Sequence, residues 1–263
     1  MTTLSKEQIE GLAEHLESAQ LQCFDVTKIT DEHPAMDFED AYAVQKVIQQ
    51  RKIERGDQLI GYKMGLTSRA KMEQMGVDSP VYGFLMSSFE VQESSAVPVS
   101  RFIHPRVEAE IAFVLKDELS GPGCTVAKVL SATDFVMPSI EIIDSRYRDF
   151  KFDLTSVIAD NASSSAFVTG STVVPVAGLD LGTVGVVLEI NGEVVEVGAG
   201  AAVLGHPANS IAQLVNMLAE TGESLPAGSL VLSGAITAAL PVKAGDCATV
   251  RAHGMGSATV RFV

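Results

Sequence analysis

Three glutamates lie within apolar stretches of the chain, where a charged side chain is costly unless it serves a purpose. Glu108 and Glu110 belong to the segment Arg106-Val-Glu-Ala-Glu-Ile, and Glu141 belongs to Ser139-Ile-Glu-Ile-Ile. Both segments are typical of β-strands. Side chains two residues apart on a strand point to the same face, so Glu108 and Glu110 are expected to face one way together.

A third carboxylate from a second strand would complete a site made of oxygen ligands. Such like charges raise one another's pKa values unless a cation neutralises them. An all-oxygen ligand set suits Mg²⁺ or Mn²⁺ better than zinc. The competing interpretation is a solvated strand face, which the Glu-x-Glu pair alone would favour because so short a pattern arises by chance. The apolar neighbours of Glu141, from Phe135 to Ile143, shift the balance toward a metal site.

The formal net charge of -14 argues against a nucleic-acid partner and against an anionic membrane surface. A metal ion can reconcile so acidic a protein with an acidic substrate. Four basic residues near these segments could add a local positive field: Lys63, Arg106, Arg146 and Arg148. Arg146 and Arg148 are the weaker candidates and are not expected to be catalytic, because arginines after a buried strand often form structural ion pairs with neighbours such as Asp144 and Asp149.

The first third of the chain shows the period of helices. Ser5 and Gln8 form a possible capping box, and apolar residues follow at helical spacing. A second helix is expected to start after Asp37 and to stop at Gly56. These two helices predict a small, mostly helical N-terminal part.

The period then changes to that of strands. Residues 58–65 predict a strand that ends in a glycine turn, and residues 68–76 predict a short helix. Lys63 is therefore expected near a strand end that faces a loop, where functional groups are commonly placed.

Strands dominate the sequence from about Pro80 onward. The segment 184–197 predicts a hairpin, because Asn191-Gly192 supplies the positive φ angles of a type I′ turn. One helix is expected over residues 209–220. Further strands are expected at these segments: 229–233, 247–251 and 257–263. The pattern predicts an α+β protein with a small helical part and a large β-rich part.

The composition is that of a soluble globular protein. The 263 residues are 46% hydrophobic, and no apolar run approaches the roughly 20 residues that a membrane helix needs. The N-terminus leads into an amphipathic helix and lacks the plan of a secretory signal. Three widely spaced cysteines without a C-x-x-C pattern predict buried thiols. We therefore expect a cytoplasmic protein.

Four segments, in this order, resemble the fumarylacetoacetate hydrolase superfamily: Gly61-Tyr-Lys-Met-Gly-Leu-Thr, His104-Pro-Arg-Val-Glu-Ala-Glu-Ile, Ile140-Glu-Ile-Ile-Asp-Ser-Arg and Ala159-Asp-Asn-Ala-Ser. Within it, the chain is similar over nearly its full length to the branch of hydratases and decarboxylases of aromatic meta-cleavage pathways. Longer strings look like the decarboxylases of that branch: Met64-Gly-Leu-Thr-Ser, Tyr82-Gly-Phe-Leu, Phe150-Lys-Phe-Asp-Leu and Ala235-Ile-Thr-Ala-Ala.

The resemblance implies the mixed β-roll of the superfamily, with residues 1–80 as a small N-terminal lid domain and 81–263 as the β-rich catalytic, metal-binding domain. It implies that Mg²⁺ or Mn²⁺ is held by Glu108, Glu110 and Glu141, and that Lys63 is the catalytic lysine. It implies the following substrate contacts: Leu66, Asp160, Asn161, Ser163 and Thr237. It also implies a homo-oligomer, at least a dimer, and a complex with the hydratase of the same pathway.

The activity implied by the resemblance is decarboxylation of a 2-oxo dicarboxylic acid, 2-oxo-3-hexenedioate, to 2-hydroxypenta-2,4-dienoate and CO₂. The alternatives are the hydratase reaction on that product, hydrolysis of a carbon-carbon bond, or a non-catalytic role beside the hydratase. Related hydratases tend to carry an Asp, implicated in proton movement, where this chain has Val81. Its absence favours a reaction that adds no water.

Overall fold

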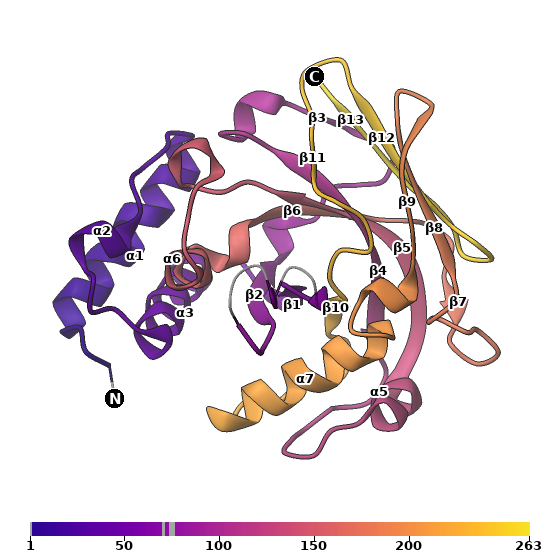
Figure 1. Cartoon of the computed structure of the whole chain (residues 1–263), viewed down its shortest axis with the longest axis horizontal. Coiled ribbons are helices and arrows are strands. Elements are labelled where there is room, and N and C mark those ends of the chain that lie inside the picture. Colours follow the sequence, from indigo (N-terminus) through magenta and orange to yellow (C-terminus); the bar gives the residue numbers. More distant parts are fainter. Residues whose placement is uncertain (1, 70–71, 74–76) are drawn as a thin grey trace.

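The structure, a computed structural model, describes residues 2–69, 72–73 and 77–263. It places helices around two curved sheets, which confirms the mixed helix-and-strand fold (Figure 1). The short helix expected over residues 68–76 falls in part on the remaining positions, and so it lies outside the described residues. Within the described ranges, no helix combines the length and the apolar character that crossing a bilayer requires.

The α-helices are α1 (Lys6–Gln22), α2 (Ile29–Glu32), α3 (Phe38–Glu54), α5 (Val126–Ala132), α6 (Leu154–Ala159) and α7 (Pro207–Glu220). Single 3-10 turns are η1 (Ser87–Phe89), η2 (Val99–Arg101), η3 (Arg148–Phe150), η4 (Asn161–Ser163) and η5 (Gly200–Ala202). The strands are β1 (Leu59–Gly65), β2 (Val81–Met86), β3 (Ala96–Val97), β4 (Arg106–Leu115), β5 (Thr133–Ile143), β6 (Ser164–Thr169), β7 (Val174–Pro175), β8 (Gly185–Ile190), β9 (Glu193–Ala199), β10 (Leu230–Leu232), β11 (Leu240–Pro241), β12 (Cys247–Ala252) and β13 (Gly256–Phe262).

The two long N-terminal helices begin where the sequence predicts. In α1 the Ser5 side chain accepts the Gln8 N–H, and the Gln8 side chain accepts the Ser5 N–H in return. Asp37 and Asp40 make the same reciprocal pair at the start of α3. Each capping box satisfies amide donors that a helix N-terminus leaves without partners.

A buried ion cluster joins α1 to α3. Glu17, 1% exposed, accepts hydrogen bonds from Arg51 Nε at 2.7 Å and from the Arg55 guanidinium, and Lys52 Nζ lies 3.5 Å away. Three cations around one carboxylate offset the cost of burying its charge. This cluster fixes how the two helices pack.

The larger sheet carries the site. Its strands run in the order β2-β1-β10-β4-β5-β6, with β11 added beside β4 and β7 beside β5. A flat sheet would hold β1 and β5, three places apart, at about 14 Å. Yet Lys63 on β1 reaches Glu141 on β5, with 2.9 Å between Nζ and Oε2. The sheet is therefore strongly curled, and the inside of the curl holds the chemistry.

The second sheet runs in the order β3-β13-β12-β8-β9, and β12 and β13 pack against β5. Its hairpin β8–β9 turns at Asn191 (φ 56°) and Gly192 (φ 82°), which confirms the predicted hairpin. The edge strand β9 exposes three valines: Val194, Val195 and Val197. Helix α7 and the last three predicted strands, β10, β12 and β13, also lie where expected, within two residues at each end.

Two helices lie where the sequence predicts mostly strands. Thr125 caps the seven-residue α5, and Asp153 caps the six-residue α6. Strand β1, expected within the N-terminal part, pairs with β2 and β10 of the large sheet. The helical part therefore ends before β1, while the division at residue 80 and the lid role remain predictions.

Candidate active site

The strand register brings the three glutamates together. Glu108 on β4 lies directly opposite Glu141 on β5, and Glu110 lies opposite Ser139. One carboxylate oxygen from each glutamate lies within 4.8 Å of the others. Oxygens on opposite sides of one Mg²⁺ or Ca²⁺ ion are about 4 to 5 Å apart, so a single divalent ion can bridge the trio.

The trio is shielded from water. Glu110 and Glu141 are fully buried and Glu108 is 7% exposed. Within the part of the chain that the structure describes, Oε1 of Glu110 and Oε1 of Glu141 have no hydrogen-bond partner. Four buried hydroxyls also lack partners there: Ser139, Ser163, Ser164 and Ser233. Such a gathering of unsatisfied oxygens fits a site completed by a cation and a ligand.

Lys63 lies beside the carboxylates. Its Nζ is 2.9 Å from Glu141 Oε2 and donates a hydrogen bond to the Ala162 carbonyl at 3.2 Å. Burial alone would lower the pKa of Lys63, but the three surrounding carboxylates, Glu141 first, raise this pKa above its usual value. The ammonium therefore stays charged and carries a proton into the site.

In the carboxylates Glu110 and Glu141, the effect of burial on the pKa outweighs the opposing charge of Lys63. Burial, and then the charge of Glu141, raise the pKa of Glu110 well above its usual value, although Lys63 opposes the shift. Burial also raises the pKa of Glu141, with Lys63 opposing and Glu108 adding to it. A divalent cation would remove the cost of holding these groups ionised.

A backbone donor that the sequence analysis did not single out orients Glu110. The Gly234 N–H donates to Glu110 Oε2 at 2.8 Å. Gly234 has φ 104°, and a Cβ at this position would lie 2.3 Å from Thr67 Oγ1. Only glycine fits here, and a glycine directly after a predicted strand was the one available signal.

A left-handed turn passes next to Lys63. Asn161, Ala162 and Ser163 have φ of 51°, 48° and 60°, a strained conformation for three successive residues other than glycine. The Asn161 side chain accepts the Phe84 N–H at 2.8 Å and donates to the Phe84 carbonyl at 3.1 Å. This pairing attaches the turn to β2.

The Arg146–Asp160 pair holds the same turn from its other end. Arg146 donates to the Asp160 carboxylate and carbonyl, and also to the Asp144 carbonyl. The structural ion pair expected for Arg146 is therefore confirmed, with Asp160 as its partner in place of Asp144 or Asp149. With the side chains of Asp160 and Asn161 bound to protein groups, their expected contact with substrate stays a prediction.

The remaining candidates lie on neighbouring loops. Leu66 follows β1 in a left-handed conformation (φ 55°) and is half-buried. The buried Thr237 hydroxyl accepts the N–H of Ala109, the residue between the two β4 glutamates, at 3.3 Å. Ser163 ends the left-handed turn. The structure thus brings Thr237 to the strand that carries Glu108 and Glu110, and the substrate-binding roles of these residues stay predictions.

Comparisons with known proteins agree with this arrangement. Residues 62–263 match the family model described as fumarylacetoacetate (FAA) hydrolase C-terminal. The chain is 58% identical over 261 residues, 99% of both chains, to the 4-oxalocrotonate decarboxylase of Pseudomonas sp. (strain CF600). It is 39% identical over 259 residues, 98% of this chain and 96% of the relative, to the 2-keto-4-pentenoate hydratase of Paraburkholderia xenovorans (strain LB400).

A solved structure extends this likeness to three dimensions. The 4-oxalocrotonate decarboxylase from Pseudomonas putida G7, complexed with magnesium and adipate, matches with a TM-score of 0.98 and 54% identity, and all of both chains is covered. The family match, the near-complete coverage of the relatives and the shared fold lead to one conclusion: this chain belongs to the fumarylacetoacetate hydrolase family.

Proposed function

We propose that this chain catalyses the metal-dependent decarboxylation of 2-oxo-3-hexenedioate to 2-hydroxypenta-2,4-dienoate and CO₂. The observation that carries the proposal is the buried trio of glutamates beside Lys63. Support comes from the 58% identical relative, which is named for this activity. The related hydratases are more distant, at 37% to 43% identity.

The proposed ion is Mg²⁺ or Mn²⁺, held by Glu108, Glu110 and Glu141. The related decarboxylase was solved with magnesium, and in a second structure with calcium. When bound, a divalent ion acts as a Lewis acid on the keto group of a 2-oxo acid. The fixed carboxylates of this chain determine where the keto-acid end of the substrate lies.

Lys63 is the proposed catalytic residue. As CO₂ departs, its bonding electrons remain on the five-carbon fragment and pass through the double bond to the keto oxygen. One proton must then be added to give 2-hydroxypenta-2,4-dienoate. We assign Lys63 Nζ, a charged donor inside the site, to orient the departing carboxylate or to supply this proton. Leu66, Ser163, Thr237 and the 160–161 segment are the proposed walls of the substrate pocket.

Val81 favours decarboxylation over the hydratase alternative. It is buried on β2, and its Cγ2 lies 3.1 Å from where a side chain at Gly65 would begin. Gly65 ends the strand that carries Lys63, so this position borders the site. An apolar side chain cannot carry the proton that water addition requires.

The decisive experiment follows CO₂ release from 2-oxo-3-hexenedioate by the purified chain with Mg²⁺. We expect turnover that a chelator abolishes and Mg²⁺ restores. Glu108→Gln, Glu141→Gln and Lys63→Met are expected to lower turnover by roughly a thousandfold or more, since losing several kcal/mol of stabilisation costs tenfold per ~1.4 kcal/mol. Glu193→Gln, at an exposed position on β9, is the control.

Several outcomes would contradict the proposal. Full turnover after thorough chelation would exclude a role for the metal in the reaction. Unchanged kinetics of Lys63→Met would exclude a catalytic role for Lys63. Conversion of 2-hydroxypenta-2,4-dienoate to 4-hydroxy-2-oxopentanoate without CO₂ release would establish the hydratase. A chain that releases no CO₂ but stimulates the hydratase would be a non-catalytic partner.

We also propose that the protein works in the cytoplasm as a homo-oligomer, at least a dimer, and that it associates with the pathway hydratase. Its three cysteines are free thiols, which suits a reducing compartment. Light scattering of the chain alone and mixed with the hydratase tests both assemblies. A single monomer mass in both samples would contradict them.

A further inference from the structure

Three of the four basic residues near the site are bound to protein groups. Lys63 pairs with Glu141, and Arg146 pairs with Asp160. Arg148 makes a surface ion pair of 3.2 Å with Asp25. Arg106 differs, because among the described residues its guanidinium has no hydrogen bond and no ion pair, only a ring contact. Its donors are therefore available to a ligand.

Arg106 lies on the face of the sheet that carries the metal ligands. It is the first residue of β4, two before Glu108, and alternation along the strand puts both side chains on the same face. Two residues of strand span about 6.7 Å, comparable with the length of an extended six-carbon chain. Arg106 is half-buried, so a charge opposite it would be only partly screened.

An aromatic ring supports the guanidinium. Arg106 Cζ lies 4.3 Å from the centroid of the Phe150 ring, a cation–π contact. Phe150 has φ 59°, a costly conformation for a bulky residue. A conformation of this cost persists only where the surrounding structure holds it, and it is in this conformation that the ring contacts Arg106.

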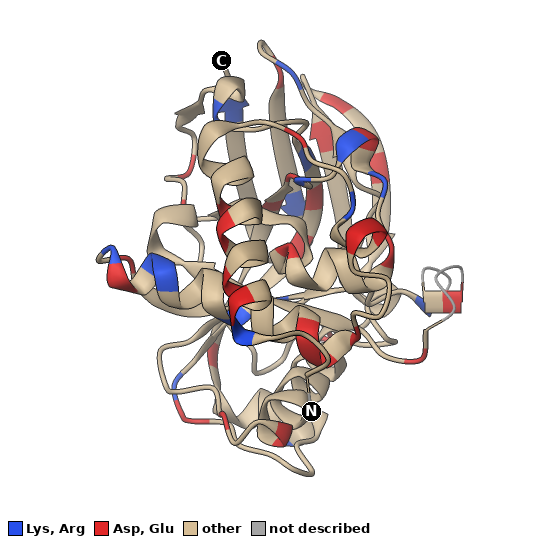
Figure 2. Ribbon diagram, turned by 90° about the vertical axis from the view of Figure 1, so that its left-hand side faces the viewer, with Lys and Arg blue, Asp and Glu red and all other residues tan. Residues whose placement is uncertain are grey.

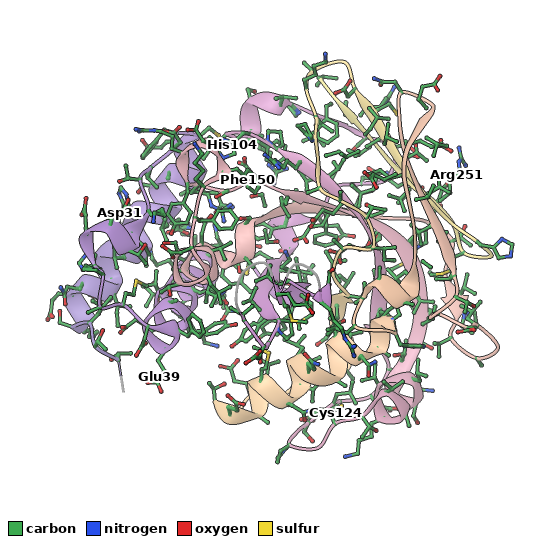
Figure 3. All side chains as sticks on the ribbon, in the orientation of Figure 1. Asp31, Glu39, His104, Cys124, Phe150 and Arg251 are labelled. Atoms are coloured by element: carbon green, nitrogen blue, oxygen red, sulfur yellow. The ribbon has the colours of Figure 1, made fainter. Side chains whose placement is uncertain are left out.

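A second side chain with an unpaired polar atom, His104, lies beside the Phe150 ring. The His104 ring centroid is 5.3 Å from that of Phe150, and Figure 3 shows the two side chains close together, near the helical side of the molecule. His104 Nε2 is buried and has no partner in the described part of the chain. The Asp144 carboxylate accepts the Ile103 and His104 N–H groups at 2.8 and 2.7 Å, which fixes the chain just before β4.

We propose that Arg106, supported by Phe150 and flanked by His104, binds the second carboxylate of the dicarboxylate substrate, the one that lies away from the metal. The inference rests on the proposed function for the identity of the substrate. A guanidinium suits this task because its planar donors match both oxygens of a carboxylate. With Arg106 on the departing carboxylate, Lys63 is left to supply the proton.

The test compares two ligands that differ only at the far end. Calorimetry in Mg²⁺ measures the affinity for 2-oxohexanedioate and for 2-oxohexanoate, in which a methyl group replaces the second carboxylate. We expect Arg106→Gln to weaken binding of the diacid by tenfold or more and to change binding of the monoacid by less than twofold. Arg106→Lys keeps the charge without the planar donors and is expected to fall between these limits.

Two further variants separate binding from folding. Arg148→Gln removes a surface arginine from the same loop as Phe150, and both affinities should stay at the wild-type values. Phe150→Leu keeps an apolar contact but loses the ring. It should weaken binding of the diacid by about threefold and leave binding of the monoacid unchanged. Thermal melting of each variant shows whether its fold is intact.

Equal losses of affinity for both ligands in Arg106→Gln, or no loss of affinity for the diacid, would overturn the subsite. If Arg106→Gln fails to fold, the affinities of Phe150→Leu for the diacid and the monoacid provide the test instead. The proposed reaction is judged separately from CO₂ release by the wild type. If the wild type releases CO₂ but Arg106→Gln weakens both ligands equally, the subsite alone is refuted. If Arg106→Gln weakens only the diacid but the wild type releases no CO₂, the proposed reaction alone is refuted.

Discussion

Burial disfavours the charged form of the glutamate trio, so that either a bound cation or a proton would stabilise it. Glu110 is fully buried, accepts one N–H from Gly234 at 2.8 Å and leaves Oε1 without a partner in the described chain. A proton and a metal ion are the two ways to lower the energy of such a group. They compete for the same oxygen.

Metal affinity is therefore expected to rise with pH. Burial raises the pKa of Glu110, so in the metal-free protein this carboxyl holds its proton to a higher pH than usual. Below that pKa, each Mg²⁺ bound must displace one proton, and the apparent Kd should fall about tenfold per pH unit. Titration of Mg²⁺ between pH 5.5 and 8, followed by calorimetry in buffers of different ionisation enthalpy, measures both the slope and the released proton. A Kd independent of pH would contradict this linkage.

Sequence alone predicts which residue types meet but not how they are held. Alternation along β4 places Glu108 and Glu110 on one face, and the apolar surroundings of Glu141 mark it as unusual. The register that sets Glu108 opposite Glu141 depends on pairing between segments some thirty residues apart, which no local pattern encodes. The Gly234 amide and the unpaired Arg106 are likewise products of tertiary structure.

The α1–α3 pair depends on the charge of Glu17. Burial raises the pKa of Glu17, but Arg55, Arg51 and Lys52 outweigh it, and the pKa ends below the ordinary value of 4.5. The stability from this cluster is therefore fully present above pH 4.5 and is lost as the pH falls through the lower, folded-state pKa. The N-terminal helices should loosen first in acid.

Glu17→Gln tests this dependence. We expect the variant to lose on the order of 2 kcal/mol in free energy of unfolding at pH 7, because the buried Lys52 and the half-exposed Arg51 and Arg55 lose their anionic partner. The loss should be smaller at pH 3 than at pH 7, because the wild-type carboxyl takes up a proton as the pH falls through its lowered folded-state pKa. Urea unfolding at both pH values measures it, with Glu14→Gln, exposed on the same helix, as the control. Equal destabilisation at pH 7 and pH 3 would refute the charge-based account.

The Arg146–Asp160 pair keeps the left-handed turn at 161–163 in place. Both side chains are at least 97% buried, so breaking the pair leaves an uncompensated charge. Asp160→Asn is expected to cost about 3 kcal/mol of stability. It should also lower kcat, because the Ala162 carbonyl bonded to Lys63 loses its support.

The neighbouring 3-10 turn offers a matched control. Among the described residues, Asp149 makes only an exposed ion pair with Lys151, and Asn tolerates its left-handed backbone. Asp149→Asn should therefore leave stability and kcat unchanged. Chemical unfolding and steady-state kinetics provide the two measurements. A kcat of Asp160→Asn equal to that of the wild type would show that the turn at 161–163 does not support catalysis.

Elements with complete local signals were predictable, and short ones were not. The capping boxes at Ser5 and Asp37 and the Asn191-Gly192 turn each encode their own geometry. Helices α5 and α6 span two turns or fewer, too short for an apolar period to stand out from the adjoining strands. Their start signals, Thr125 and Asp153, are also common in loops.

The molecule as a whole is acidic, and Figure 2 shows acidic positions outnumbering basic ones on the face of the N-terminal helices. The net charge of -14 means that repulsion weakens the folded state. Three of its carboxylates, Glu108, Glu110 and Glu141, are concentrated in the core. A bound divalent ion should therefore stabilise the entire fold as well as the site.

Mg²⁺ at a hundred times its Kd is expected to add about 2.7 kcal/mol to the free energy of unfolding. For a chain of this length the melting temperature should rise by roughly 5 to 10 °C. Glu110→Gln replaces a buried carboxyl, whose charged form is disfavoured, by a neutral amide, so without metal it should melt no lower than the wild type, and it should show no response to Mg²⁺. Scanning calorimetry at constant ionic strength provides the test, and an equal response of both proteins would place the ion elsewhere.

The depth of Lys63, Glu110 and Glu141, at 2%, 0% and 0% exposure, has a kinetic consequence. Neither an ion nor a six-carbon acid can diffuse onto side chains that solvent does not reach. Binding must therefore follow a spontaneous local opening of the protein, and the observed association rate should reach a plateau as ligand concentration increases. The plateau would equal the rate at which the residues that cover the glutamates open.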